Sequence, residues 1–342
     1  MFRVFIAATA QGAIEAETVR CREKFSFLLN DPDLKGLCLT IDPLREGWST
    51  PLQTHHYRSG CAPLEALHDA CTHLRQGRIH FAIITGSDSL KTGYLREERN
   101  RMMQIYGNHI SLPEAYTALA ESFCRRHDLP LETFRVLRNA LFNNYRRSAP
   151  HVRIDPLRME SVTGLFRAVD CANPFMDYSG WLLLCREDML EIIRPDEPAV
   201  EVLGTGLAMT RGDGPEYIDE IASYYHLKKA CSMASEQAGF DFAEVFNCKK
   251  AFMEAYTCYP VVPMGLLLSA GFVSDLQEIP VWLAEHRLTM KGGMNLDRAP
   301  WNLPALRALI DMSRKLKQHP GMIGGVHGNG GLGGRQGFAI LG

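Results

Sequence analysis

The sequence predicts an α/β fold, a layered α/β/α/β/α sandwich of two similar halves with a helical insertion. Strands and helices alternate at both ends of the chain, and the second series repeats the order of the first. Parallel strands joined in this way need helices on both faces of their sheet. The length of 342 residues fits one doubled unit or two domains of ~150 residues. The alternative is one doubly wound sheet with decorations.

Apolar stretches predict the elements of the first third. The helix expected over 61–76 is amphipathic, with one face formed by Leu64, Leu67, Cys71 and Leu74. Gly77 ends this helix. A further helix is expected over 13–29, and strands over 4–8, 36–41 and 79–85.

The last 145 residues repeat this order. Strands are expected over 200–207, 243–246, 322–326 and 337–341, and helices over 215–238 and 303–316. Asn302 is placed to cap the last helix, and Pro304 suits its first turn. The middle is rich in helix, over 114–126 and 131–144, before a strand over 180–185. The expected domains are a first half over 1–87 and 161–195, an insertion over 88–160 and a second half over 196–342.

Composition excludes several classes of partner. The net charge is −2, and the sequence has no block of basic residues that would predict binding to nucleic acid or to an anionic membrane. No apolar run approaches the ~18 residues of a membrane span. The first acidic residue is Glu15, which leaves room for a short organelle address. We therefore expect an intracellular protein, with a mitochondrial location favoured over the cytoplasm and the peroxisome.

The ten cysteines include no C-x-x-C pair, so we expect no metal site. We also expect no tightly bound cofactor. Cys61 opens a predicted helix, where the helix dipole lowers a thiol pKa and makes it nucleophilic; the alternative is a small buried hydrophobe. Cys248 follows Asn247 and precedes two lysines, an electropositive setting if exposed. Chance placement is the alternative for Cys248.

Residues 324–334 hold seven glycines in eleven residues, which permits close approach of the backbone to a ligand. No Gly-Lys-Ser/Thr follows, which excludes a P-loop. The segment precedes a strand, which excludes a dinucleotide fingerprint. An active-site loop fits best, and a plain glycine-rich hairpin is the alternative.

Taken in order, these blocks resemble the thiolase superfamily, and within it degenerate sterol-carrier-protein type-2 thiolase-like proteins of the kind known from trypanosomatids. Residues 61–88 resemble the nucleophile helix and its following strand. Pro174-Phe175-Met176-Asp177 resembles the Pro-Thr-Ser-Asp turn, and 244–248 the Glu-Leu-His-Asp-Cys-Phe motif. Residues 292–294 resemble the Gly-Gly-Leu segment, and 327–334 the closing His-Asn-x-Gly-x-Gly-Gly. The resemblance implies two βαβαβαββ halves, a loop domain and a homodimer built on the edge strand of the first half.

The chain departs from this family at the catalytic positions. Counted back from Gly77, the nucleophilic Cys falls on Gly60. The His of His-Asp-Cys-Phe falls on Phe246, and the His of the Gly-His-Pro box on Ala299. Claisen chemistry needs a thiolate and its bases. Residues that act together in catalysis contribute non-additively, so the loss of one of them removes most of the rate enhancement.

The resemblance therefore implies a protein that binds CoA or acyl-CoA with little or no thiolase activity. The candidate catalytic residues are Cys248, Cys61 and His327. The resemblance puts Arg211 near the CoA, although a solvated turn arginine is the alternative; the other candidate binding residues are Gly292, Gly293, Gly330 and Gly331. Two other functions stay open. One is an active acyl-CoA hydrolase, acyltransferase or retro-aldol lyase, and the other is a non-catalytic partner subunit of an acyl-CoA enzyme.

Overall fold

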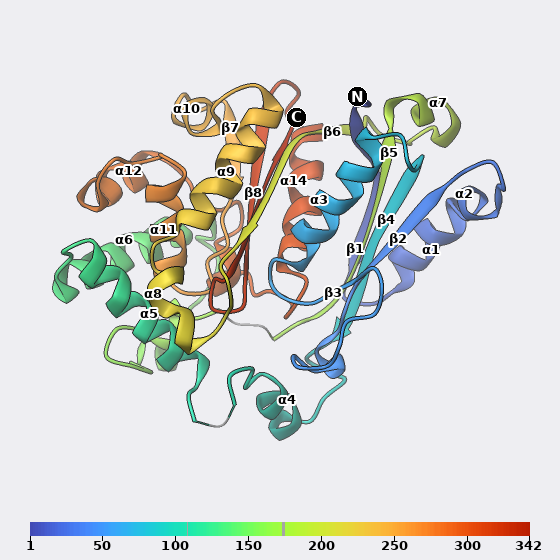
Figure 1. Ribbon diagram of the computed structural model, residues 1–342. Coiled ribbons are helices and arrows are strands. Elements are labelled where there is room, and N and C mark those ends of the chain that lie inside the picture. Colours follow the sequence, from blue (N-terminus) through green and yellow to red (C-terminus); the bar gives the residue numbers. More distant parts are fainter. Residues whose placement is uncertain (108, 173–174) are drawn as a thin grey trace.

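The computed structural model describes residues 1–107, 109–172 and 175–342, and it has an α/β fold around one mixed nine-stranded sheet (Figure 1). The sheet order is β3-β2-β4-β5-β1-β6-β9-β8-β7. The strands are β1 (Val4–Gly12), β2 (Gly36–Ile41), β3 (His56–Tyr57), β4 (Phe81–Ser89), β5 (Asp177–Arg186), β6 (Val200–Met209), β7 (Ala251–Glu254), β8 (Ile323–Gly330) and β9 (Arg335–Leu341).

The second half of the sheet repeats the first. The first half runs β3-β2-β4-β5-β1, and the second, taken from the opposite edge, runs β7-β8-β9-β6. In each half the penultimate strand, β5 or β9, is antiparallel to both of its neighbours. The halves join where β1 pairs with β6. Within the described ranges the second half has no counterpart of β3, so β7 forms an edge of the sheet.

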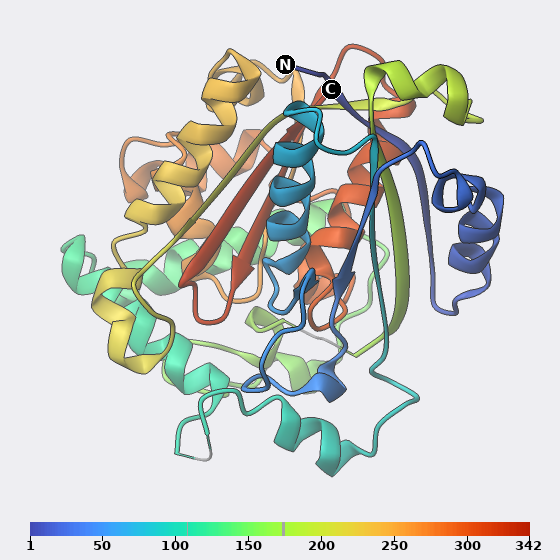
Figure 2. The ribbon, with the colours of Figure 1, turned by 45° about the vertical axis from the view of Figure 1, so that its right-hand side comes forward.

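Two helices, α3 (Ala62–Arg75) and α14 (Pro304–Lys317), pack together between the two halves of the sheet (Figures 1 and 2). Strand β5 shows how the layers are specified, because its successive side chains point to opposite faces. Trp181 packs with Phe25 in the outer layer, whereas Leu182 belongs to the central core with α3 and α14. The result is the expected sequence of helix, sheet, helix, sheet and helix layers.

The remaining helices form the outer layers and the insertion. The insertion packs on the second half, and α5 begins with a capping box between Ser111 and Glu114. These helices are α1 (Ala16–Lys24), α2 (Phe27–Asn30), α4 (Arg96–Met102), α5 (Leu112–Arg126), α6 (Leu131–Ser148), α7 (Leu190–Ile193), α8 (Ile218–Ile221), α9 (Tyr225–Ala238), α10 (Phe242–Asn247), α11 (Val261–Ser269), α12 (Ile279–Glu285) and α13 (Gly293–Leu296). None of the helices described is both long and apolar enough to cross a bilayer.

Four local predictions are wrong. The strand expected over 243–246 is helix α10, which begins where the Asp241 side chain accepts the Ala243 N–H at 2.8 Å. The helix expected over 215–238 is interrupted at Tyr224, which adopts a left-handed φ of 48°. The helix expected over 13–29 divides into α1 and α2. Asn302 does not cap α14, because its side chain donates to the carbonyl oxygen of Asp42.

The edge of the first half is short. Strand β3 has two residues and pairs with β2 at Thr40 and Ile41. The expected homodimer uses this edge, which offers little backbone for pairing with a second chain. The homodimer stays a prediction.

Candidate functional site

A cavity of about 290 Å³ lies where the insertion meets both halves of the molecule. The turn before α3, the turn after β7 and the end of β8 all reach it. Its walls are largely apolar and aromatic, with a few hydroxyl, thiol and amide groups. The lining residues are Trp48, Gly60, Asn100, Met103, Gln104, Ile105, Ser111, Leu112, Pro113, Tyr116, Ala172, Tyr256, Cys258, Tyr259, Met294, Pro300, Trp301, Asn302, Asn329 and Gly331.

Gly60 and Tyr256 meet in this cavity. A Cβ atom built on Gly60 would lie 1.9 Å from the Tyr256 hydroxyl oxygen and 2.5 Å from the carbonyl oxygen of Asn329. Real Cβ atoms do not approach other atoms so closely, so position 60 has no room for a side chain while Tyr256 keeps its place. The phenol hydroxyl thus occupies the space where a side chain on residue 60 would begin.

The Tyr256 hydroxyl has no hydrogen-bond partner in the part of the chain that the structure describes, whereas its backbone N–H donates to His327 Nδ1 at 3.4 Å. Burial raises the pKa of the Tyr256 phenol well above its ordinary value. The hydroxyl therefore stays protonated at neutral pH. It is a free hydrogen-bond donor facing the cavity.

A second hydroxyl, that of Tyr116, is fully engaged. It donates to the Gly331 carbonyl oxygen at 2.8 Å and accepts from Asn329 Nδ2 at 3.1 Å. The Cys258 thiol donates to the Tyr116 hydroxyl oxygen at 3.4 Å, and burial raises the pKa of that thiol to about 12. Cys258 is therefore a neutral thiol, and Tyr116 ties the insertion to the turn after β8.

None of the described residues that line the cavity acts as a base near neutral pH. Its lining, over the residues described, contains no aspartate, glutamate, histidine, lysine or arginine. The tyrosines and Cys258 are protonated there, for the reason just given. The site can accommodate a largely apolar ligand and donate hydrogen bonds to an acceptor atom on it. The described residues of its walls offer neither a thiolate nor a side chain that takes up a proton near neutral pH.

Comparison with solved structures finds the same fold in proteins of low sequence identity. No known sequence family and no curated protein matches the chain. A monomeric SCP2-thiolase-like protein type 1 from Mycobacterium smegmatis superimposes with a TM-score of 0.70 at 14% identity, over 99% of this chain and 76% of that one. An Ltp2–ChsH2(DUF35) aldolase superimposes with a TM-score of 0.66 at 13% identity, over 99% and 97%. The fold is thiolase-like.

Within this thiolase-like fold, Cys61 lies beside the cavity but does not line it. Cys61 occupies the N-cap position of α3 without a side-chain capping hydrogen bond and is completely buried. Its sulfur lies 3.0 Å from where a Cβ on Gly337 would stand. Burial raises the pKa of the Cys61 thiol well above its ordinary value, the reverse of the activation expected at a helix start.

Phe246 lies on α10 and Cys248 directly follows this helix, both away from the cavity. Phe246 packs against Phe272 and Trp282 in the outer core, and Cys248 is exposed at the end of the helix. The turn after β7 enters the cavity instead. Its sequence Glu254-Ala255-Tyr256-Thr257-Cys258-Tyr259 keeps the Glu, the Cys and the closing aromatic of Glu-Leu-His-Asp-Cys-Phe, with Tyr256 in place of the His. That spacing is the signal by which sequence analysis could have found Tyr256.

His327 contacts the backbone of Tyr256 and positions it. Its Nδ1 accepts the Tyr256 N–H, so Nε2 carries the proton and donates to Gln336 Oε1 at 2.8 Å. Burial lowers the pKa of His327 to about 4, which keeps the ring neutral. His327 does not line the cavity, and its contacts make it a positioning residue.

The five candidate ligand-binding residues lie in three places. Arg211 is exposed and pairs with Glu220 at 2.9 Å, away from the cavity. Gly331 lines the cavity in a left-handed turn, with φ of 61°, and Gly330 precedes it. A Cβ on Gly293 would lie 2.3 Å from Thr257 Oγ1, so this glycine permits close packing on the turn that carries Tyr256. Gly292 packs against Ala149.

The structure also locates the other features singled out in the sequence. The glycine-rich segment is the β8–β9 hairpin, and its turn reaches the cavity at Gly331. Ala299 is buried near Tyr256 and His327. Pro174 lies outside the described residues. Over the ranges described, no three His, Cys, Asp or Glu side chains gather in a way that could hold a metal ion.

Proposed function

We propose that this cavity binds CoA or an acyl-CoA and that the protein does not carry out thiolase turnover. One observation carries the proposal, namely the Tyr256 hydroxyl in the space where a side chain on Gly60 would begin. A Claisen reaction needs a thiolate that takes up the acyl group. Neither Gly60 nor Tyr256 supplies one.

The lining supports binding of a thioester rather than its conversion. Apolar groups such as Trp48, Met103 and Trp301 suit an acyl chain or the pantetheine arm. The protonated hydroxyl of Tyr256 suits the thioester carbonyl oxygen, which only accepts hydrogen bonds. No base lines the described cavity to remove a proton from the α-carbon.

Tryptophan fluorescence and calorimetry test this proposal directly. Two of the four tryptophans, Trp48 and Trp301, line the cavity, so CoA or acetoacetyl-CoA should change the emission as it binds. We expect Tyr256→Phe to weaken acetoacetyl-CoA about tenfold, the effect of losing one hydrogen bond to a carbonyl. Tyr224→Phe is the matched control, since it also removes a buried hydroxyl without a described partner, away from the cavity.

Two results would overturn the proposal. One is the absence of any heat or emission change at millimolar CoA and acetoacetyl-CoA. The other is thiolysis of acetoacetyl-CoA by free CoA at an ordinary enzymatic rate, which would require a nucleophile that we do not assign. A Cys61→Ala variant should bind acetoacetyl-CoA like the parent protein, because Cys61 does not line the cavity.

Retro-aldol cleavage is the second candidate, favoured by the free donor of Tyr256 and by the fold shared with an aldolase. In such a reaction a β-hydroxyacyl thioester loses its hydroxyl proton to water, and its Cα–Cβ bond breaks. The bond's electron pair passes to the thioester carbonyl, giving an enolate that Tyr256 would hold before Cα is protonated.

A β-hydroxyacyl-CoA distinguishes the two functions. Retro-aldol cleavage releases a carbonyl compound and a shortened acyl-CoA, both visible by mass spectrometry. Loss of this cleavage in Tyr256→Phe but not in Tyr224→Phe would establish the lyase. Recovery of intact substrate, together with saturable binding, would favour the non-catalytic function.

A further inference from the structure

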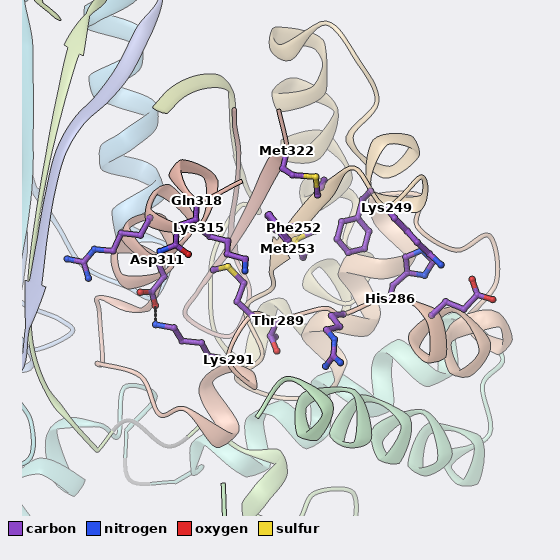
Figure 3. Close-up of a pocket in the computed structure, with 16 residues that line it drawn as sticks. Lys249, Phe252, Met253, His286, Thr289, Lys291, Asp311, Lys315, Gln318 and Met322 are labelled. Carbon is purple, nitrogen blue, oxygen red and sulfur yellow. Dashed lines mark ion pairs between the residues drawn. The ribbon is translucent and has the colours of Figure 1, made fainter. Parts of the chain in front are cut away.

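A second cavity, of about 610 Å³, lies on the second half of the molecule (Figure 3). Its walls are the edge strand β7, the segment 285–291 and the second half of α14. We refer to it as the basic groove. Its lining residues are Phe246, Lys249, Ala251, Phe252, Met253, Glu285, His286, Arg287, Thr289, Met290, Lys291, Asp311, Arg314, Lys315, Gln318 and Met322.

The groove exists because the second half lacks a strand. In the first half β3 lies beside β2, but over the residues described nothing pairs with the outer edge of β7 as a strand. The segment 285–291 instead touches the end of β7, where the Ala255 N–H donates to the Leu288 carbonyl oxygen at 3.1 Å. Space that a strand would fill is left open between this segment and α14.

The charge of the groove is strongly positive. Five cationic side chains line it, against two carboxylates, in a chain whose net charge is −2. One carboxylate, Asp311, is already engaged by Lys291 Nζ at 2.9 Å and Gln11 Nε2 at 2.8 Å. The other four cations have no carboxylate within 4.0 Å in the part of the chain described, and these are Lys249, Arg287, Arg314 and Lys315.

The floor of the groove is apolar. Phe252 and Met253 lie at its centre, between Lys315 and Lys291 on one side and Lys249 and His286 on the other (Figure 3). Phe252 is only partly buried, and Lys315 Nζ lies 5.1 Å from its ring centroid. The groove thus offers a hydrophobic aromatic surface with cations on both sides.

We infer that the basic groove binds an organic phosphate, a ligand with at least two negative charges and an apolar or aromatic body. Lysine and arginine side chains that lack carboxylate partners pair readily with phosphate oxygens. The partly exposed Phe252 ring and the adjacent methionines would contact the body of the ligand. The volume lies within the range of small-ligand pockets. The inference does not depend on the function proposed for the other cavity.

Three probes test the inference and distinguish a free phosphate ligand from a lipid headgroup. They are inorganic pyrophosphate, ADP, and vesicles of phosphatidylcholine with or without phosphatidic acid. We expect ADP or the phosphatidic acid vesicles to bind, and pyrophosphate, which has no body, to bind at least tenfold more weakly than ADP. Affinity should fall as salt is raised, because partly exposed charges are screened.

A charge-reversed protein supplies the decisive comparison. Arg314→Glu/Lys315→Glu should weaken the bound probe at least tenfold by calorimetry. Lys228→Glu/Lys229→Glu makes the same change of net charge on the exposed face of α9 and should bind like the parent protein. Phe252→Leu should reduce the affinity for ADP toward that for pyrophosphate. Circular dichroism and thermal unfolding establish that each variant is folded.

The outcomes are separable. Equal binding by the two charge-reversed proteins overturns the inference, as does failure of all three probes to bind at millimolar concentration and low salt. A selective loss with ADP assigns a free organic phosphate, and a selective loss with vesicles assigns a lipid headgroup. The change in tryptophan emission on adding acetoacetyl-pantetheine, a thioester without the ADP group of CoA, should be the same in all variants, because Trp48 and Trp301 line the other cavity. This keeps the test apart from that of the proposed function.

Discussion

The hydroxyl oxygen of Tyr256 lies 1.9 Å from the point where a Cβ atom on Gly60 would stand. A side chain at position 60 is therefore incompatible with the Tyr256 phenol in its present place, and the Asn329 carbonyl oxygen, 2.5 Å from the same point, obstructs it as well. Gly60 is separated from Tyr256 by almost 200 residues, and only the packing of the turn after β7 against the turn before α3 brings them together. Gly60 and Tyr256 are thus coupled through their packing.

Gly60→Ala tests this coupling. We expect the variant to lose about 1–3 kcal/mol of unfolding free energy, because the new methyl group must displace the Tyr256 side chain. The loss should be about 1 kcal/mol smaller in a Tyr256→Ala background, in which part of the obstruction is absent. Urea unfolding of the two single variants, the double variant and the parent protein measures the coupling energy. Additive losses would show that the two sites do not meet in solution.

Local patterns in the sequence predict the layers correctly because they are set by short-range periodicity. The amphipathic repeat that predicts the helix over 61–76 gives α3, and the apolar run over 36–41 gives β2 with the same bounds. The strand predicted over 243–246 is wrong. This segment is only four residues long, and its pattern of apolar and polar residues fits a strand or a helix equally well. There the Asp241 cap and packing of Phe242 and Phe246 decide for helix.

The same local difference separates Cys248 from the cavity. A strand at 243–246 leads the sequence analysis to place the motif with Glu and Cys at 244–248 and makes Cys248 a candidate. The true strand is β7, whose end carries Tyr256 into the cavity. The basic groove lies beside the unpaired edge of β7, over the residues described. It depends on a missing strand and on contacts between segments that are distant in the sequence. Hydrophobic periodicity predicts neither of these.

Burial of the cysteines predicts a clear order of alkylation. Cys248 and Cys38 are exposed, whereas Cys61, Cys71 and Cys258 are buried. Iodoacetamide should modify Cys248 first and Cys61 at least about a hundredfold more slowly, since burial raises the pKa of the Cys61 thiol and blocks access to it. Peptide mass spectrometry over time gives both rates. Rapid labelling of Cys61 in the native protein would mean that it is open to the cavity.

Glu254 should destabilise the protein near neutral pH. Burial raises the pKa of its carboxyl to about 8, so the native state keeps the proton while the unfolded state releases it above about pH 4.5. The destabilisation is absent below that pH and grows as pH rises toward 8. Glu254→Gln retains an acceptor for the Met290 N–H and should gain about 2 kcal/mol of unfolding free energy at pH 7. The gain should vanish near pH 4, and a gain that is independent of pH would contradict this origin.

His327 should produce the opposite dependence at lower pH. Because burial lowers the pKa of His327 to about 4, the native ring stays neutral while the unfolded ring takes up a proton below about pH 6.5. Its contribution is constant above pH 7, and stability is lost as pH falls from about 6.5 to about 4. The loss amounts to about 2 kcal/mol at pH 5.

His327→Gln isolates this effect, because glutamine does not titrate and can still accept the Tyr256 N–H. Denaturant unfolding of the parent and the variant at pH 7, 6 and 5 measures the difference. The parent should lose about 2 kcal/mol relative to the variant between pH 7 and pH 5. Parallel stability curves would mean that the ring is charged or solvated in the native state. The hydrogen bond that orients the turn carrying Tyr256 would then not depend on a neutral imidazole.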